Sequence, residues 1–127
     1  MPRSDEEWKT RLNPEQYRVL RRRGTELPFT GKLLFNKARG VYSCVGCGAP
    51  VFSSDAKFDS PDGWPSFYEP LNKGAVKYNE TSIFGIKCFQ VACAKCGGHL
   101  GHVFDDGPLP TGKRYCINSC ALGFEKK

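Results

Sequence analysis

The sequence predicts an α+β protein that is mainly antiparallel β, with short helices at its N-terminus. Three observations predict this class. Helix-capping signals precede residue 25, strand-like stretches punctuated by glycine and proline follow it, and two Cys-x-x-Cys pairs flank residues 48–92. A chain of 127 residues suits one domain. We therefore expect a single domain, 1–127, in which a helical segment (1–24) precedes a metal-clamped β core (25–127).

Two capping signals predict the N-terminal helices. Ser4 with Glu7 has the spacing of a capping box. Asn13, Pro14 and Gln16 repeat the signal as an N-cap, a first helical residue and an N3 amide. Both signals indicate helices that begin close to these residues.

The second helix should end in the arginine run at 21–23, with Gly24 as its cap. Basic residues suit a helix C-terminus, which explains the run better than a phosphate site does. Tyr17, Leu20 and Val19 are expected to face the core.

Short β segments and turns make up the remainder of the chain. The expected strands are 41–43, 50–52, 83–91 and 114–118. The first two flank a cysteine pair as a hairpin would. Residues 58–70, rich in aromatics, proline and glycine, predict an ordered loop, and residues 99–112 predict a polar hairpin region.

Composition excludes several classes of protein. No apolar run approaches the ~18 residues of a membrane span, and residues 1–10 lack the apolar core of a secretory signal, so we expect a cytoplasmic protein without a membrane anchor. The net charge of +6 falls to about +4 if four thiolates hold a zinc ion, which is too mild to predict nucleic-acid binding. Seven cysteines without an export signal are more typical of metal ligands or reactive thiols than of disulfides.

The two cysteine pairs have the spacing of a metal site. Each pair is followed by glycine, Gly48 or Gly97, which permits the positive φ that such a turn requires. Two such turns complete a tetrahedral site without an open position, as in structural zinc. The predicted ligands are Cys44, Cys47, Cys93 and Cys96. Two separate redox motifs, or thiols without metal, are the alternatives.

Cys116 stands out among the other thiols. On a strand, residues two apart share a face, so Arg114, Cys116 and Asn118 would form one row. A guanidinium beside a thiol favours the nucleophilic thiolate, and the carboxamide would bind a substrate oxygen or the sulfur. The simpler interpretation is that Cys116 is a small buried hydrophobe.

Two further groups would complete a site. His99 and His102, followed by Asp105 and Asp106, suit acid/base chemistry beside a thiolate, although a second metal site or a structural role would also explain them. Trp64, with aromatic neighbours such as Phe67, would form an apolar wall for a methyl group. Alternatively, these aromatics are core.

Taken together, these motifs resemble the methionine-R-sulfoxide reductase (MsrB) family. The resemblance covers nearly the whole chain and is carried by both cysteine pairs, GWPSF (63–67), HLGHVFDDGP (99–108) and RYCINS (114–119). It implies two packed antiparallel sheets with N-terminal helices and a structural zinc away from the active site. It also implies an oxidoreductase that repairs oxidised proteins by reducing methionine-R-sulfoxide, protein-bound or free.

The resemblance assigns roles to individual residues. Cys116 would attack the sulfoxide sulfur and become a sulfenic acid, with Arg114 stabilising its thiolate. Trp64 and Phe67 would contact the substrate, the indole packing on the ε-methyl group. The groups that would bind and polarise the sulfoxide oxygen are His99, His102, Asp106 and Asn118.

The chain departs from the family pattern at the resolving thiol. Many members carry that cysteine just before Gly-Trp-Pro, where this chain has Pro61 and Asp62. Cys88 on another strand, Cys120 if the chain turns at Ser119, or an external thiol would have to resolve the sulfenic acid. Thioredoxin is the reductant that the resemblance implies.

Two other classes remain open. A zinc-ribbon module that binds nucleic acid or protein would concentrate basic residues at the two Cys-x-x-Cys turns, or knuckles, but only Lys95 lies inside one of them. A regulator of small GTPases on a related zinc-containing β fold would need no reactive thiol. We expect a monomer in any of these cases.

Overall fold

The computed structural model describes residues 4–59, 63–83 and 85–126. Within these described residues two helices, α1 (Asp5–Arg11) and α2 (Pro14–Arg22), precede nine strands. The strands are β1 (Gly40–Cys44), β2 (Pro50–Ser53), β3 (Lys57–Phe58), β4 (Ser66–Phe67), β5 (Val76–Ile83), β6 (Ile86–Cys93), β7 (His99–Phe104), β8 (Arg114–Ile117) and β9 (Leu122–Lys126). Two 3-10 turns, η1 (Ser54–Ala56) and η2 (Ser119–Ala121), precede β3 and β9.

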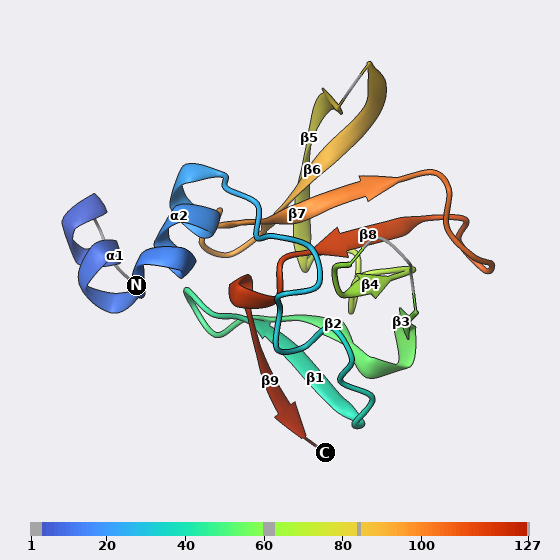
Figure 1. Ribbon diagram of the computed structural model, residues 1–127, viewed down its shortest axis with the longest axis horizontal. Helices are drawn as coiled ribbons and strands as arrows, with labels where there is room; N and C mark the ends of the chain where they lie inside the picture. The colour runs from blue at the N-terminus through green and yellow to red at the C-terminus, as the bar shows by residue number, and fades with distance from the viewer. Residues whose placement is uncertain (1–3, 60–62, 84, 127) are drawn as a thin grey trace.

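The strands form two antiparallel sheets (Figure 1). The smaller has the order β2-β1-β9 and the larger the order β3-β4-β8-β7-β6-β5. Fully buried aromatic rings of both sheets meet: Phe52 of β2 stacks on Phe67 of β4 with centroids 4.5 Å apart, and Tyr42 of β1 meets Phe67 edge-on at 5.1 Å. The predicted class, two packed antiparallel sheets with short N-terminal helices, is confirmed.

Both helices begin at the predicted caps. The Ser4 hydroxyl accepts the Glu7 backbone N–H at 3.3 Å, and Asn13 and Gln16 form a reciprocal capping box. The predicted core residues Val19 and Leu20 of α2 are buried. These contacts fix α2 against the rest of the domain.

The end of α2 differs from the prediction. Arg23, rather than Gly24, takes the left-handed conformation, with φ of 57°. Gly24 is still required, because a Cβ there would lie 3.0 Å from the backbone oxygen of Arg18. The predicted end of the helix is therefore correct, but Arg23 takes the capping position that was predicted for Gly24.

The strand predictions need four corrections. The predicted strand 83–91 is two strands, because the chain turns at Gly85 (φ 79°) between β5 and β6. The polar strand β5 was missed, although it pairs with β6 along its whole length. Residues 99–104 form β7 rather than a hairpin loop, and the predicted loop 58–70 contributes to the short strands β3 and β4.

Among the described residues, no helix is long and apolar enough to cross a membrane.

Candidate active site

Four cysteines gather where the two sheets meet. Their sulfur atoms all lie within 4.8 Å of one another, with Sγ–Sγ distances of 3.7 Å for Cys44–Cys96 and 3.5 Å for Cys47–Cys93. Zn–S bonds of about 2.3 Å in tetrahedral geometry require sulfur atoms about 3.8 Å apart. The cluster therefore fits a four-thiolate metal site. Within the described parts of the chain it is the one group of three or more potential metal ligands.

Each half of this cluster is a tight turn at the end of one sheet. Gly48 after β1 has φ of 80° and Gly97 after β6 has φ of 75°, as the cysteine-pair pattern predicts. The turns join β1 to β2 and β6 to β7, so a bound ion would connect the two sheets. Leu20 of α2 packs against both turns. It lies so close that a Cβ atom added at Gly46 or Gly98 would clash with its side chain.

The thiol of Cys116 lies elsewhere, in the middle of the larger sheet. Cys116 on β8 pairs with Ser66 of β4 on one side and with His102 of β7 on the other. Arg114 Nη1 donates to Cys116 Sγ at 2.7 Å. The predicted pairing of residues two apart on one strand face is therefore present, and a cation at this distance favours the thiolate.

Arg114 is itself held in place. Its Nε and Nη2 donate to the two carboxylate oxygens of Asp106 at 2.8 and 3.0 Å, and its guanidinium lies 4.7 Å from the centroid of the Phe104 ring. The same guanidinium lowers the pKa of Asp106. This fork orients the Arg114 guanidinium beside the thiol.

A β-bulge brings the two histidines together. Residues three apart on a regular strand point to opposite faces, but Val91 pairs with Gly101 and Ala92 with His99, which leaves one extra residue on β7. The ring centroids of His99 and His102 are consequently 5.3 Å apart.

Both imidazoles are uncharged at neutral pH. Burial, with smaller contributions from His102 and Arg23, lowers the pKa of His99 to about 4, and burial also lowers that of His102. His99 is 4% exposed, and its Nε2 has no hydrogen-bond partner among the described residues. A neutral ring still offers one N–H donor.

Asn118 lies just past the end of the strand on which the row was expected. β8 ends at Ile117, and Asn118 caps η2. Its Nδ2 donates to the Leu100 backbone oxygen at 3.0 Å, and its Oδ1 accepts the Glu26 N–H at 2.9 Å. The carboxamide is thus buried and oriented by two backbone groups.

The two aromatic residues predicted to bind substrate differ in their exposure to solvent. Trp64 is partly exposed, and its Nε1 donates to the Glu26 backbone oxygen at 3.0 Å. Phe67 is fully buried, because alternation along β4 turns it away from the face on which Ser66 meets Cys116. Phe67 therefore belongs to the core, which corrects the expected substrate contact.

Comparisons with known proteins agree with this geometry. The model of the SelR domain family matches residues 12–126. The chain belongs to that family. Similar proteins include two named "Peptide methionine sulfoxide reductase MsrB". That of Leptospira interrogans is 56% identical over 98% of this chain and 95% of its own length, and that of Methanosarcina mazei is 54% identical over 98% and 89%.

Two further comparisons concern a plant relative and the fold. The chloroplastic peptide methionine sulfoxide reductase B1 of Arabidopsis thaliana is 54% identical over 94% of this chain and 59% of its own length. The crystal structure of the Mis18 'Yippee-like' domain covers 70% of this chain and 97% of that one with a TM-score of 0.57. At 16% identity that likeness concerns the fold alone.

In this SelR-domain chain Cys88 is poorly placed to pair with Cys116. Cys88 lies on β6, and β7 separates β6 from β8. Two strand spacings amount to about 9.5 Å, beyond the ~7 Å Cα separation that a disulfide spans. Burial also raises the pKa of the Cys88 thiol. The positions of Pro61 and Asp62 lie outside the described residues.

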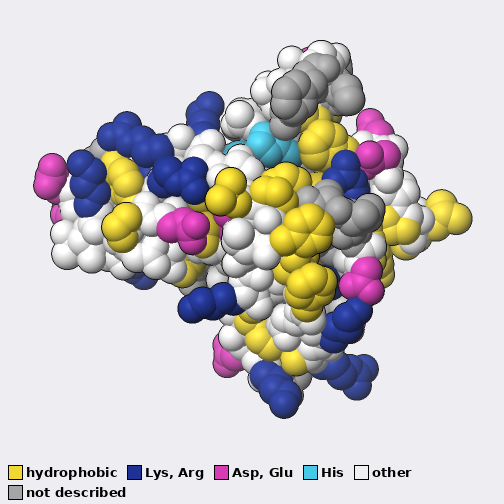
Figure 2. Space-filling view, in the orientation of Figure 1, with side chains coloured by type: hydrophobic (Ala, Val, Ile, Leu, Met, Phe, Trp, Pro, Cys, Tyr) yellow, Lys and Arg dark blue, Asp and Glu magenta, His cyan; other side chains and the backbone are white. Residues whose placement is uncertain are grey.

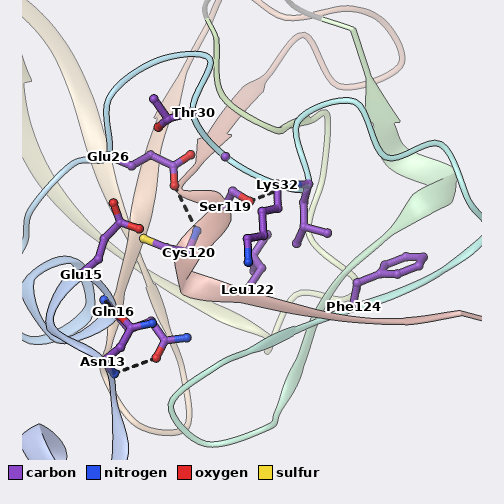
Figure 3. Close-up of a pocket in the computed structure, with 12 residues that line it drawn as sticks. Asn13, Glu15, Gln16, Glu26, Thr30, Lys32, Ser119, Cys120, Leu122 and Phe124 are labelled. Atoms are coloured by element: carbon purple, nitrogen blue, oxygen red, sulfur yellow. Dashed lines mark hydrogen bonds between the residues drawn. The ribbon is translucent and has the colours of Figure 1, made fainter.

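Cys120 follows the turn at Ser119 on which its candidacy depended. Its side chain lines a cavity of about 580 Å³ beside α2, and Cys116 is not among the residues that line this cavity (Figure 3). Burial and the charges of Glu26 and Glu15 raise the pKa of Cys120 to about 12. A thiol that resists ionisation is a poor resolving nucleophile.

Apolar side chains extend from this family site onto the surface. Figure 2 shows hydrophobic side chains gathered beside a histidine that reaches the surface. Leu27 and Phe29 are 73% and 62% exposed, and the Phe29 N–H donates to the Gly63 backbone oxygen next to Trp64. Phe29 has φ of 67°, which is rare for an aromatic residue.

Sequence reasoning missed Glu26 and Ser66. Ser66 lies opposite Cys116, and its place inside the GWPSF motif was the available signal. Glu26 is 2% exposed but stands in a loop, where a lone acidic residue normally indicates a solvated surface.

Proposed function

We propose that the protein reduces methionine-R-sulfoxide to methionine, free or within oxidised proteins, with Cys116 as the nucleophile. The observation that carries the proposal is the 2.7 Å contact between Arg114 Nη1 and Cys116 Sγ, on a face shared with His102. This contact supplies a stabilised thiolate in the place that the family motif requires.

The reaction balances as an oxygen transfer between two sulfur atoms. The Cys116 thiolate attacks the sulfoxide sulfur and forms a transient S–S bond. The oxygen then passes to the Cys116 sulfur, so that a new S–O bond forms there while the S–S bond and the S–O bond of the substrate break. The substrate gains two electrons and leaves as methionine, and Cys116 loses two electrons and becomes a sulfenic acid. The proton that the thiol gave up is returned to the transferred oxygen.

Recognition and proton transfer fall to the polar groups beside Cys116. The neutral imidazoles of His99 and His102 and the second Nδ2–H of Asn118 are the donors that would hold the sulfoxide oxygen. The partly exposed indole of Trp64 would pack on the ε-methyl group. Two different walls at one chiral sulfur would select the R epimer.

An external thiol would complete the cycle. The distance to Cys88 and the raised pKa of Cys120 both favour attack on the sulfenic acid by thioredoxin or another thiol. That attack forms a mixed disulfide and releases the oxygen as water, and a second thiol then frees Cys116.

The four-cysteine cluster would hold one zinc ion in a structural role. Four protein thiolates would fill its coordination, so the ion would connect the sheets and take no part in the reaction. The spacing of the sulfur atoms supports this assignment.

Exposed apolar residues support a polypeptide substrate. Leu27 and Phe29 stand on a loop that is hydrogen-bonded to the Gly63–Trp64 segment, so they would contact residues next to the sulfoxide in an oxidised chain. A free amino acid would be too small to reach them.

Three serine substitutions test this function with dithiothreitol as reductant. Cys116→Ser should lower turnover of methionine-R-sulfoxide at least about 1000-fold, as removal of a nucleophile does. Cys88→Ser and Cys120→Ser are matched controls that should stay within about twofold of wild type. Activity retained by Cys116→Ser would refute the nucleophile, and activity lost in either control with thioredoxin but not with dithiothreitol would reveal an internal resolving thiol.

A further inference from the structure

Glu26 is a buried acid that the reaction does not use. It lies in the segment between α2 and β1, is 2% exposed, and lines the cavity beside η2 (Figure 3). A charged residue is buried this deeply only when specific partners hold it.

The backbone of Glu26 is bonded to both groups proposed to recognise the sulfoxide. Its N–H donates to Asn118 Oδ1 at 2.9 Å, and its carbonyl oxygen accepts the Trp64 indole N–H at 3.0 Å. The backbone of Glu26 therefore orients both the Asn118 carboxamide, proposed to bind the sulfoxide oxygen, and the Trp64 indole, proposed to contact the ε-methyl group.

The side chain of Glu26 determines where that backbone stands. Its Oε1 accepts the backbone N–H of Cys120 at 3.0 Å, the contact drawn as a dashed line in Figure 3. Cys120 belongs to η2, which directly follows the strand of Cys116. Close packing restrains the carboxylate further, because a Cβ at Gly31 would lie 2.7 Å from Glu26 Oε2.

The other carboxylate oxygen has no hydrogen-bond partner among the described residues. Burying an unsatisfied polar atom destabilises a protein, so an apolar side chain here would cost less. A carboxylate at this position therefore indicates that its contact with η2 is needed.

We propose that Glu26 is a positioning residue for recognition of the sulfoxide. Its carboxylate fixes the loop against η2, and this sets where the Trp64 indole and the Asn118 amide stand relative to Cys116. The proposal rests on the proposed function. The thiolate itself does not depend on Glu26, because Arg114 is held by Asp106.

Three variants separate positioning from general stability. Glu26→Leu removes the acceptor, Glu26→Gln keeps one, and Glu15→Leu alters the other carboxylate that lines the cavity. KM and kcat are measured on free methionine-R- and S-sulfoxide, and the rate of Cys116 alkylation at pH 7 is followed by peptide mass mapping.

The expected result is a split between recognition and thiol reactivity. Glu26→Leu should raise KM for the R epimer about tenfold, the typical effect of losing a buried hydrogen bond, and should lower the R/S activity ratio. Its Cys116 alkylation rate should stay within about twofold of wild type. Glu26→Gln should restore most of the affinity, and Glu15→Leu should match wild type.

Other outcomes would overturn the proposal. These are an unchanged KM and R/S ratio in Glu26→Leu, a Glu26→Gln variant as impaired as Glu26→Leu, or alkylation that falls in step with activity. If Glu26→Leu does not fold, Glu26→Asp replaces it with the same expectations, because its shorter side chain falls short of the Cys120 N–H. A wild type inactive on both epimers would contradict the proposed function itself.

Discussion

The four-cysteine cluster and the Cys116 site use the same type of side chain, cysteine, for different purposes. In the cluster, four thiols face one point within 4.8 Å of one another, and Leu20 of α2 packs over the turns that carry them. At Cys116 a single thiol accepts a hydrogen bond from the Arg114 guanidinium, and His102 and Ser66 pair with Cys116 from the neighbouring strands. The neighbours of a cysteine therefore decide whether it serves structure or reaction.

Loss of the cluster should have the largest effect. Cys93→Ser removes one ligand of the proposed zinc ion, and structural zinc sites contribute about 10–16 kcal/mol of apparent binding free energy, comparable with the whole stability of a domain. We expect the variant to lose its zinc and its cooperative thermal unfolding, measured by metal analysis and circular dichroism. Cys116→Ser is the matched control and should keep both. Equal thermal stability of the two variants would refute the contrast.

Acid should have the next largest effect, because protonation of His99 lowers the stability of the folded protein. Its folded-state pKa of about 4 lies below the ordinary value of 6.5, so between these pH values the unfolded chain binds more protons. Stability is therefore full above about pH 6.5 and is lost as pH falls toward 4, by roughly 3 kcal/mol for the whole interval. Urea unfolding at pH 7, 5.5 and 4.5 measures this loss. His99→Gln should show a shallower slope, and an unchanged slope would contradict the assignment.

Removing the guanidinium should impair the reactive thiol and spare the cluster. In Arg114→Met the long apolar side chain preserves packing on Phe104, but Cys116 loses its cationic partner. We expect Cys116 alkylation at pH 7 and sulfoxide turnover each to fall about tenfold or more. Lys95→Met, a change of the same kind inside a knuckle, should leave both rates unchanged. Equal rates in Arg114→Met and wild type would show that the contact does not activate the thiol.

The smallest effect concerns the surface beside the site. Leu27→Ser with Phe29→Asn, in which asparagine tolerates the left-handed backbone, should lower kcat/KM about threefold to tenfold on an oxidised peptide with apolar neighbours, the magnitude of losing one or two apolar contacts. Activity on the free amino acid should not change. Leu109→Ser, at the most exposed leucine (88%), is the control. A parallel loss on both substrates would argue against a polypeptide contact.

The same contrast explains what could be predicted from sequence. The cluster and the Arg114–Cys116 pair depend on spacings of three and two residues along the chain, so local geometry was enough. The approach of His99 to His102 depends on a bulge set by pairing with β6, and no local pattern in the chain indicates it. The edge strand β5 escaped because its residues are mostly exposed and polar. Glu26 and Asn118 meet 92 positions apart, which only the tertiary fold can bring about.

The central claim is that Cys116 alone carries the oxidising equivalent. Its most direct test is the intact mass and thiol count of the zinc-loaded protein after one equivalent of methionine-R-sulfoxide without reductant, beside the same experiment with the S epimer. We predict that the R epimer adds one oxygen, mapped to Cys116, with one thiol lost and no disulfide formed, and that the S epimer adds none. Loss of two thiols outside the cluster would contradict an external resolving thiol, and no reaction with either epimer would contradict the reductase function.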